Sequence, residues 1–282
     1  AWRRLTQNRA AMVSLWLLGA MTLACFIGPW LTPWGLADVD WNAFDVGPTL
    51  EGGHWLGTDA NGRDLLTRTL YGGQVSLSVA LVATFVSLII GVLYGAVSGY
   101  IGGRVDNLMM RFVDIMYSLP FMFLVILLMV VFGRNIFLIY AAIGAVEWLD
   151  MARIVRGQTL ALKQREFVEA AHALGVKDGK IVTRHLIPNA IGPVIVYVTL
   201  TVPKVILLES FLSFLGLGVQ EPLTSWGVLI SEGADMMQTS PWVLLVPSVF
   251  LALTLFSTTV VAIPLLLERD RDFITAMITS IK

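Results

Sequence analysis

The chain has 282 residues, of which 56% are hydrophobic and 14% charged, and its formal net charge is −1. Soluble domains carry about 25% charged residues, so this composition excludes most soluble classes. A near-neutral charge also argues against a nucleic-acid-binding protein, which needs a basic patch. Cys25 is the single cysteine, so no disulfide can form within the chain.

Hydrophobic runs divide the chain into candidate membrane spans. A helix needs about 20 apolar residues to cross about 30 Å of hydrocarbon. We place six spans at residues 11–31, 75–97, 115–132, 136–148, 191–214 and 242–267. The fourth run is short, and we expect it to continue through Leu149, Met151 and Ala152. Prolines are tolerated in membrane helices but weaken them, and the expected weak points are Pro120, Pro203, Pro247 and Pro264. The expected fold is an all-α membrane protein with six transmembrane helices.

The first run could be a secretory signal, because arginines precede it. Its apolar part continues past Cys25 to Leu31, which is longer than the core of a signal peptide, so we expect an uncleaved helix. The absence of methionine at position 1 suggests a truncated chain.

Residues 32–71 form a long polar loop, and loops of this length are usually functional or mobile. The pieces Gly57-Thr58-Asp59 and Gly62-Arg63-Asp64 are typical of turns. Thr58 or Asp59 is expected to cap a helix that runs through Thr67. The loop either has a function of its own or only orders the entry to the second span.

The longest charged run between hydrophobic segments covers residues 166–189. Phe167, Ala170, Ala171 and Leu174 have the spacing of one helix face, and the small alanines leave room for another surface to approach. Gly175 follows, where a helix end favours a left-handed residue. A second short helix is expected over residues 177–187, ended by Pro188.

Ionisable residues inside the spans are costly and therefore informative. Lys204 lies near the middle of the fifth span, and Glu209 lies about 140° around the same helix, so the two do not share a face. We interpret Lys204 as facing a polar path for a substrate, with Glu209 as a further candidate for that path. Glu147 and Asp150 share a face, and we expect them to pair with a neighbouring subunit or with Arg153.

The distribution of Lys and Arg predicts the orientation in the membrane. Most basic residues fall on one side, which is therefore the cytoplasmic side and holds both termini and residues 166–189. The exceptions on the opposite side are Arg63, Arg68 and Arg134.

No phosphate-binding loop, nucleophile elbow or metal-protease motif occurs anywhere in the sequence. His54, His172 and His185 are scattered without the spacing of metal ligands. We therefore expect no catalytic residues, no metal site and no cofactor bound by this chain.

Three stretches carry a resemblance to a known family. Glu169-Ala170-Ala171, followed by Gly175 and by Ile187-Pro188, resembles the EAA loop of the membrane subunits of binding-protein-dependent ABC importers. Residues 54–59 with 62–64 resemble the segment before the second membrane helix of dipeptide and oligopeptide permeases. Residues 210–218 with Pro222 and 225–227 resemble the segment after the fifth. The similarity covers nearly the whole chain up to about residue 255 and is closest to the C-type subunit of oligopeptide importers.

The resemblance implies a type I ABC importer permease fold in the bacterial cytoplasmic (inner) membrane. It also implies the partners: a second permease subunit, two cytoplasmic ATPase subunits that bind ATP and Mg, and an extracytoplasmic peptide-binding protein. Docking to an ATPase would involve Phe167, Glu169, Ala170, Ala171, Leu174 and Gly175. Oligopeptides are the implied cargo, with dipeptides, nickel chelates or antimicrobial peptides as alternatives.

We expect residues 1–72 to form the first helix and an outer loop, residues 73–267 the permease core, and residues 268–282 a cytoplasmic tail. The stretch from residue 257 onward departs from the usual end of such subunits. An ion-coupled secondary transporter is the alternative from another class, but it would have inverted repeats and acids at the midplane, and no convincing repeat is present.

Overall fold

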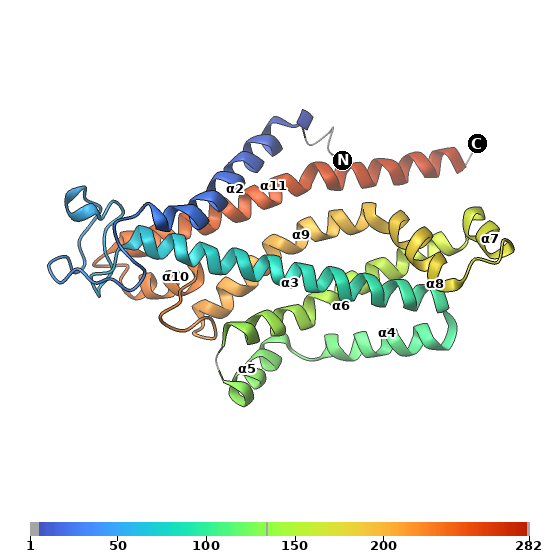
Figure 1. Cartoon of the computed structure of the whole chain (residues 1–282), viewed down its shortest axis with the longest axis horizontal. Helices are drawn as coiled ribbons and strands as arrows, with labels where there is room; N and C mark the ends of the chain where they lie inside the picture. The colour runs from blue at the N-terminus through green and yellow to red at the C-terminus, as the bar shows by residue number, and fades with distance from the viewer. Residues whose placement is uncertain (1–5, 134, 281–282) are drawn as a thin grey trace.

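The computed structural model describes residues 6–133 and 135–280. These residues are mostly helical and contain no strand, only an isolated bridge between Thr58 and Asp64. The long helices lie roughly along one axis, with the loop before α3 at one end and α7 at the other (Figure 1). The α-helices are α2 (Arg9–Ile27), α3 (Leu65–Ile101), α4 (Gly103–Ser118), α5 (Phe121–Phe132), α6 (Ile136–Lys163), α7 (Glu166–Ala173), α8 (Asp178–Ile181), α9 (Ile187–Phe214), α10 (Trp226–Asp235) and α11 (Pro241–Ser280).

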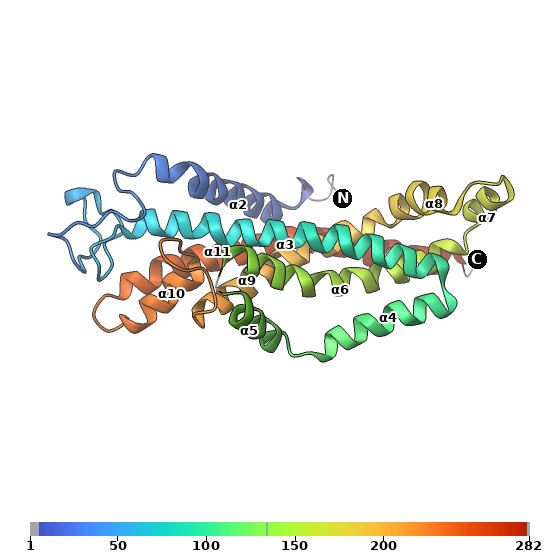
Figure 2. The ribbon, with the colours of Figure 1, turned by 60° about the horizontal axis from the view of Figure 1, so that its bottom comes forward.

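Helix α3 is the axis of the bundle, with α2, α6 and α9 packed along it (Figures 1 and 2). It begins ten residues before the predicted span because Asp64 caps it: the side chain of Asp64 accepts a hydrogen bond from the backbone N–H of Thr67 at 2.8 Å. The prediction of a cap at Thr58 or Asp59 is therefore wrong. Asp59 instead closes the preceding turn by accepting from the backbone N–H groups of Asn61 and Arg63.

Three glycines, Gly91, Gly95 and Gly99, lie one turn apart on α3 and face α6. A Cβ atom at Gly95 would lie 2.3 Å from the carbonyl oxygen of Ala152, and one at Gly99 would lie 2.8 Å from that of Arg156. Small residues at this spacing allow two helix backbones to approach closely. The close contact between α3 and α6 therefore requires that these three positions carry no side chain.

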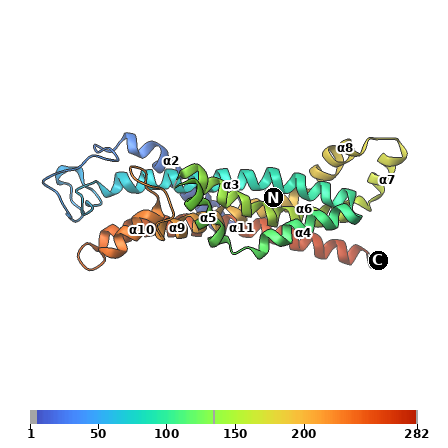
Figure 3. The same cartoon turned by 90° about the horizontal axis from the view of Figure 1, so that it is seen from below.

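The third predicted span is wrong as a single helix. The chain breaks between α4 and α5, whose axes differ by 84°, and Leu119 has an extended conformation. The cause is Pro120, since a proline pushes the preceding residue out of the helical region. Helix α4 lies on the outside of the bundle against α3 and α6, and α5 lies against α6 (Figure 3).

Pro188 does not end a helix, contrary to the prediction. A π-helical turn over Val182–Leu186 joins α8 to α9, so that one helical segment runs from Asp178 to Phe214. A π turn displaces the hydrogen-bond ladder by one residue, which accommodates the missing N–H of a proline. The side chain of Asn189 also donates to the carbonyl of His185 at 2.6 Å.

By length and composition, four helical segments are apolar enough to cross a membrane: residues 9–30, 65–101, 178–214 and 241–264. The bent pair α4–α5 would be a fifth. Helix α6 carries Glu147, Asp150, Arg153 and Arg156 and does not meet the same criterion. The all-helical class is confirmed for the described residues, whereas the count of six spans is not.

Ion pairs hold the loop end together. Arg68 of α3 is buried and binds Asp59 at 2.5 Å and Glu232 of α10 at 2.6 Å. Arg63 binds Asp59 and Glu221, both at 2.9 Å. Arg68 thus joins α3 to α10, and Arg63 joins the loop before α3 to the loop before α10. Of the basic residues used to predict orientation, Arg3, Arg4, Arg134 and Lys282 lie outside the described residues.

Candidate functional site: an exposed helix at one end and a polar cavity in the bundle

Helix α7 is short and sharply terminated. Glu166 and Glu169 lie in its first turn, where negative charge is favoured by the helix dipole. At its C-terminus Gly175 has φ +71°, its N–H donates to His172 O at 2.9 Å, and the N–H of Val176 donates to Ala171 O at 3.0 Å. This pair of hydrogen bonds is a Schellman motif. The left-handed conformation predicted for Gly175 is confirmed.

The apolar face predicted for α7 is divided in two. Ala171 is buried together with Val168, which the sequence analysis did not single out. Phe167, Ala170 and Leu174 face outward, and Leu174 is 83% exposed. We call these three exposed residues the docking ridge. Grouping Ala171 with them is wrong, because its side chain packs into the core beneath α7. Glu169 is also exposed.

A polar cluster ties the turn after α7 to α3. The hydroxyl of Tyr100, at the end of α3, donates to Asp178 Oδ1 of α8 at 2.7 Å and lies 3.3 Å from His172 Nε2. Lys163, at the end of α6, donates to the carbonyl of Tyr100 at 2.5 Å. The end of α3 is thereby bonded to residues on both sides of the Gly175 turn, and the end of α6 is bonded to the same residue of α3.

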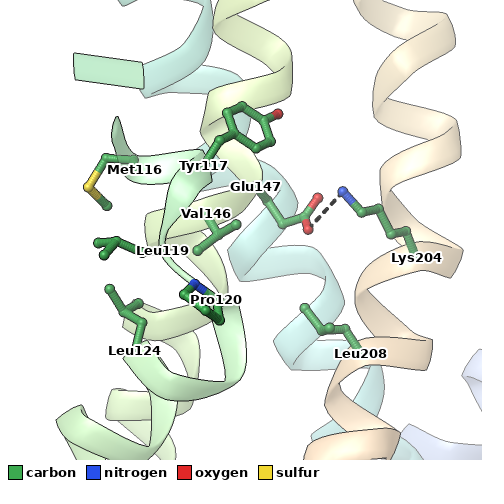
Figure 4. Close-up of a pocket in the computed structure, with 9 residues that line it drawn as sticks. All are labelled: Met116, Tyr117, Leu119, Pro120, Leu124, Val146, Glu147, Lys204 and Leu208. Carbon is green, nitrogen blue, oxygen red and sulfur yellow. Dashed lines mark ion pairs between the residues drawn. The ribbon is translucent and has the colours of Figure 1, made fainter. Parts of the chain in front are cut away.

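A cavity of about 380 Å³ lies where α4 breaks before α5, opposite α6 and α9 (Figure 4). Apolar side chains form most of its wall. Its lining residues are Met116, Tyr117, Leu119, Pro120, Leu124, Val146, Glu147, Lys204 and Leu208. The sequence analysis identified Pro120 only as a weak point and missed Tyr117. The helix break at this proline creates the space.

Lys204 lies at this cavity and bridges two carboxylates of α6. Its Nζ is 3.1 Å from Glu147 Oε1 and 3.1 Å from Asp150 Oδ2. Tyr117 donates a hydrogen bond to the other oxygen of Asp150. The predicted pairing of Glu147 and Asp150 with Arg153 is wrong, because Arg153 binds Asp114 at 2.5 Å and lies over the ring of Tyr117. The alternative, pairing with a neighbouring subunit, stays a prediction.

Glu209 lies apart from the cavity. It is fully buried, and its two carboxylate oxygens accept hydrogen bonds from Ser213 and Ser76, each at 2.7 Å. The structure thus places Lys204 and Glu209 in different surroundings, in agreement with their predicted faces. A role of Glu209 in a substrate path stays a prediction, as does the role of the docking ridge.

Within residues 6–133 and 135–280, no group of three or more His, Cys, Asp or Glu side chains could hold a metal ion. Glu209 is held by serine hydroxyls, whereas Lys204, Glu147 and Asp150 form an ion triad. Such a set can bind, exclude or orient a charged ligand.

Two family models match the chain. Residues 87–269 match the binding-protein-dependent transport system inner membrane component. Residues 1–48 match the N-terminal transmembrane domain of oligopeptide transport permease C. The first match covers all of α4 to α10, with parts of α3 and α11, and includes both α7 and the cavity.

Curated relatives are similar over most of their length. The oligopeptide transport system permease protein OppC of Haemophilus influenzae is 56% identical over 91% of this chain and 82% of its own. The protein of the same name from Escherichia coli is 55% identical over 91% of this chain and 85% of its own. The dipeptide transport system permease protein DppC of Bacillus subtilis is 43% identical over 91% and 80%. With its helical bundle, its capped helix α7 and these matches, the chain belongs to the family of binding-protein-dependent transport system inner membrane components, as a multi-pass permease subunit of the type I ABC importer fold.

Proposed function

We propose that this chain forms half of the translocation path of an ATP-driven importer that carries oligopeptides into the cytoplasm. Two relatives that are 55% and 56% identical are named as oligopeptide permeases. The observation that carries the coupling role is the docking ridge. Phe167, Ala170 and Leu174 are exposed on a capped helix whose following turn is bonded to α3.

The proposed partners are a second permease, two cytoplasmic ATPase subunits that bind ATP and Mg, and an extracytoplasmic peptide-binding protein. Catalysis belongs to the ATPases, and this chain converts their closure into a rigid-body movement of its helices. The docking ridge presents small and apolar side chains to a groove of the ATPase. The cluster around Tyr100 passes the movement to α3 and α6.

The proposed location is the bacterial cytoplasmic membrane, with α7 and both termini on the cytoplasmic side. Single cysteines at Lys177, beside α7, and at Leu50, in the loop end, test this orientation. On intact cells an impermeant thiol reagent should modify Leu50→Cys and leave Lys177→Cys unmodified until the membrane is opened. The reverse order would overturn the orientation.

Dipeptides are the second candidate cargo, because a dipeptide permease is 43% identical over 91% of the chain. Transport by vesicles that contain all partner subunits tests both the peptide length of the cargo and the energy source. Uptake of peptides of graded length is measured with ATP and Mg, with a non-hydrolysable ATP analogue, and with an ion gradient alone. Oligopeptide uptake only with hydrolysable ATP supports the proposal. Uptake driven by the gradient would favour an ion-coupled transporter.

A further inference from the structure

One carboxylate oxygen of Glu147 has no hydrogen-bond partner in the described part of the chain. Oε1 faces Lys204, but Oε2 has no hydrogen-bond donor among the described residues, although the side chain is only 2% exposed. The other buried carboxylates of the bundle are satisfied: both oxygens of Glu209 accept hydrogen bonds from serines, and both oxygens of Asp106 bind Arg156. A buried charged oxygen without a donor is unfavourable, so a ligand that supplies one is stabilised there.

The charges around Glu147 also leave room for a cation. Glu147 and Asp150 share the single positive charge of Lys204. Arg153, one turn along α6 from Asp150, is already paired with Asp114. The group thus has a formal charge of −1 in a cavity whose wall is largely apolar, where charges interact more strongly than in water.

We infer that Glu147, held by Lys204 and Asp150, binds a primary ammonium group, and that in transport this is the N-terminal ammonium of the peptide. This inference rests on the proposed function. An ammonium group donates up to three hydrogen bonds and brings the formal charge of the group to zero. An anionic end of a ligand is repelled by the same carboxylates. Every unmodified peptide carries this group whatever its sequence, so one contact serves a cargo of varied side chains.

Lys204 keeps the binding of the peptide ammonium reversible. It is half exposed on a flexible stem, whereas Glu147 is buried against the bundle. In the empty site Lys204 limits the repulsion between the two carboxylates. When a peptide enters, Lys204 keeps Glu147 Oε1 and Asp150 occupied, so the incoming ammonium has a single oxygen, Oε2, to bind. A single charge-assisted contact guides a peptide without trapping it.

The test uses the complete importer in vesicles and two neutral peptides that differ only in N-terminal acetylation. Both must bind the binding protein, as measured separately. In Glu147→Gln, uptake of the free-amine peptide at subsaturating concentration should fall about tenfold, because a charged hydrogen bond is lost. Uptake of the acetylated peptide should not change. Glu147→Asp should restore part of the difference, and Glu221→Gln, which alters an ion-paired carboxylate at the loop end and away from the cavity, is the matched control.

If Glu147→Gln takes up each of the two peptides as fast as the unaltered chain does, the inference is overturned. An importer that takes up no peptide with ATP would instead contradict the proposed function.

A second measurement leaves Glu147 in place, in case Glu147→Gln does not assemble. Leu208→Cys puts a thiol in the cavity wall, while the native Cys25 is fully buried and gives the labelling background. A cationic thiol reagent should modify Cys at this position faster than an anionic reagent of equal size, and the free-amine peptide should protect it. Equal rates without protection would overturn the inference. Equal protection by an acetylated peptide containing lysine would overturn the assignment to the N-terminus.

Discussion

The hydroxyl of Tyr100 lies 2.7 Å from Asp178 Oδ1, which joins the last turn of α3 to the first turn of α8 across 78 residues of sequence. The ring of Tyr100 also stacks on His172 of α7, with centroids 6.2 Å apart. Helix α3 therefore ends on the turn that follows the docking ridge. In the proposed coupling, movement of α7 would reach α3 through these two contacts.

Tyr100→Phe should remove the hydrogen bond to Asp178 without leaving a cavity, because the ring remains and only the hydroxyl is lost. The loss of one hydrogen bond costs about 1 kcal/mol of stability. The expected result is a higher number of ATP molecules hydrolysed per peptide transported, with the ATPase subunits still bound. The measurement is the ratio of ATP hydrolysis to uptake in vesicles.

Tyr94→Phe is the matched control for that change. Tyr94 also lies on α3, and its hydroxyl donates to the carbonyl of Met109 on α4 at 2.8 Å, away from α7. An equal loss of coupling in both variants would mean that Tyr100 acts only through general stability.

The division of the α7 face predicts different results for two neighbouring alanines. Ala170→Leu places a bulky side chain on the docking ridge, and overfilling a contact costs about 1–3 kcal/mol, or about ten- to a hundredfold in affinity for the ATPase. Ala171→Leu should instead lower the stability of the permease itself, because Ala171 is buried. Co-purification of the ATPase subunits and thermal unfolding of the permease separate the two effects.

Three other substitutions in residues 166–189 serve as comparisons for Ala170→Leu. Gly175→Val should also weaken ATPase binding, because a β-branched residue resists the left-handed conformation that ends α7. Glu169→Ala should have a milder effect, and Lys180→Ala, on an exposed position, should have little. Full retention of the ATPase by Ala170→Leu would leave residues 166–189 as a connecting loop only.

The ion pair between Arg63 and Glu221 should weaken only in acid. The hydrogen bond and the positive charge of Arg63 hold the pKa of Glu221 below its usual value of 4.5. A carboxylate with a lowered pKa contributes stability above its unfolded-state pKa, and the contribution is lost as the pH falls through the lowered value. Because Glu221 is 73% exposed, the contribution is below about 1 kcal/mol.

Glu221→Gln should therefore lower the melting temperature slightly, and by the same amount at about pH 7 and about pH 6. The difference should begin to decline near pH 4.5 and vanish once the pH falls below the lowered pKa of Glu221. Glu51→Gln, which alters an exposed carboxylate of the loop before α3, is the control. A difference that already declines between pH 7 and pH 6 would contradict this assignment.

Local patterns in the sequence predicted the helical class and the end of α7 correctly. Gly175 was identifiable because helix termination by glycine depends on a single residue. Whether Pro120 and Pro188 break their helices could not be predicted from the local sequence. Both prolines disfavour helix locally, but one breaks the chain by 84° while the other lies in a helix that a π turn and Asn189 adjust. Tertiary packing decides between these outcomes.

The candidate cavity was predictable only in part. Lys204, Glu147 and Asp150 were visible as charges inside hydrophobic runs, but their pairing depends on the relative rotation of α6 and α9, which the sequence pattern does not contain. Tyr117 had no signal of its own. The buried side of α7 was missed because Val168 and Phe167 are both apolar, and either could have formed the inward face.

The spacing of Gly91, Gly95 and Gly99 was readable from the sequence and carries the last prediction. Gly95→Val should disrupt the contact of α3 with α6, since its Cβ would lie 2.3 Å from a backbone oxygen that cannot move without the helix. Overpacking of this kind costs about 1–3 kcal/mol or more, so the variant should assemble poorly and melt at a lower temperature. Gly192→Val is the matched control, because nothing lies within 4 Å of a Cβ at Gly192 on α9. Both variants add the same β-branched residue to a helix, so their intrinsic helix propensities cancel in the comparison. A loss of assembly in Gly95→Val alone would establish the close approach of α3 and α6, and equal behaviour of the two variants would contradict it.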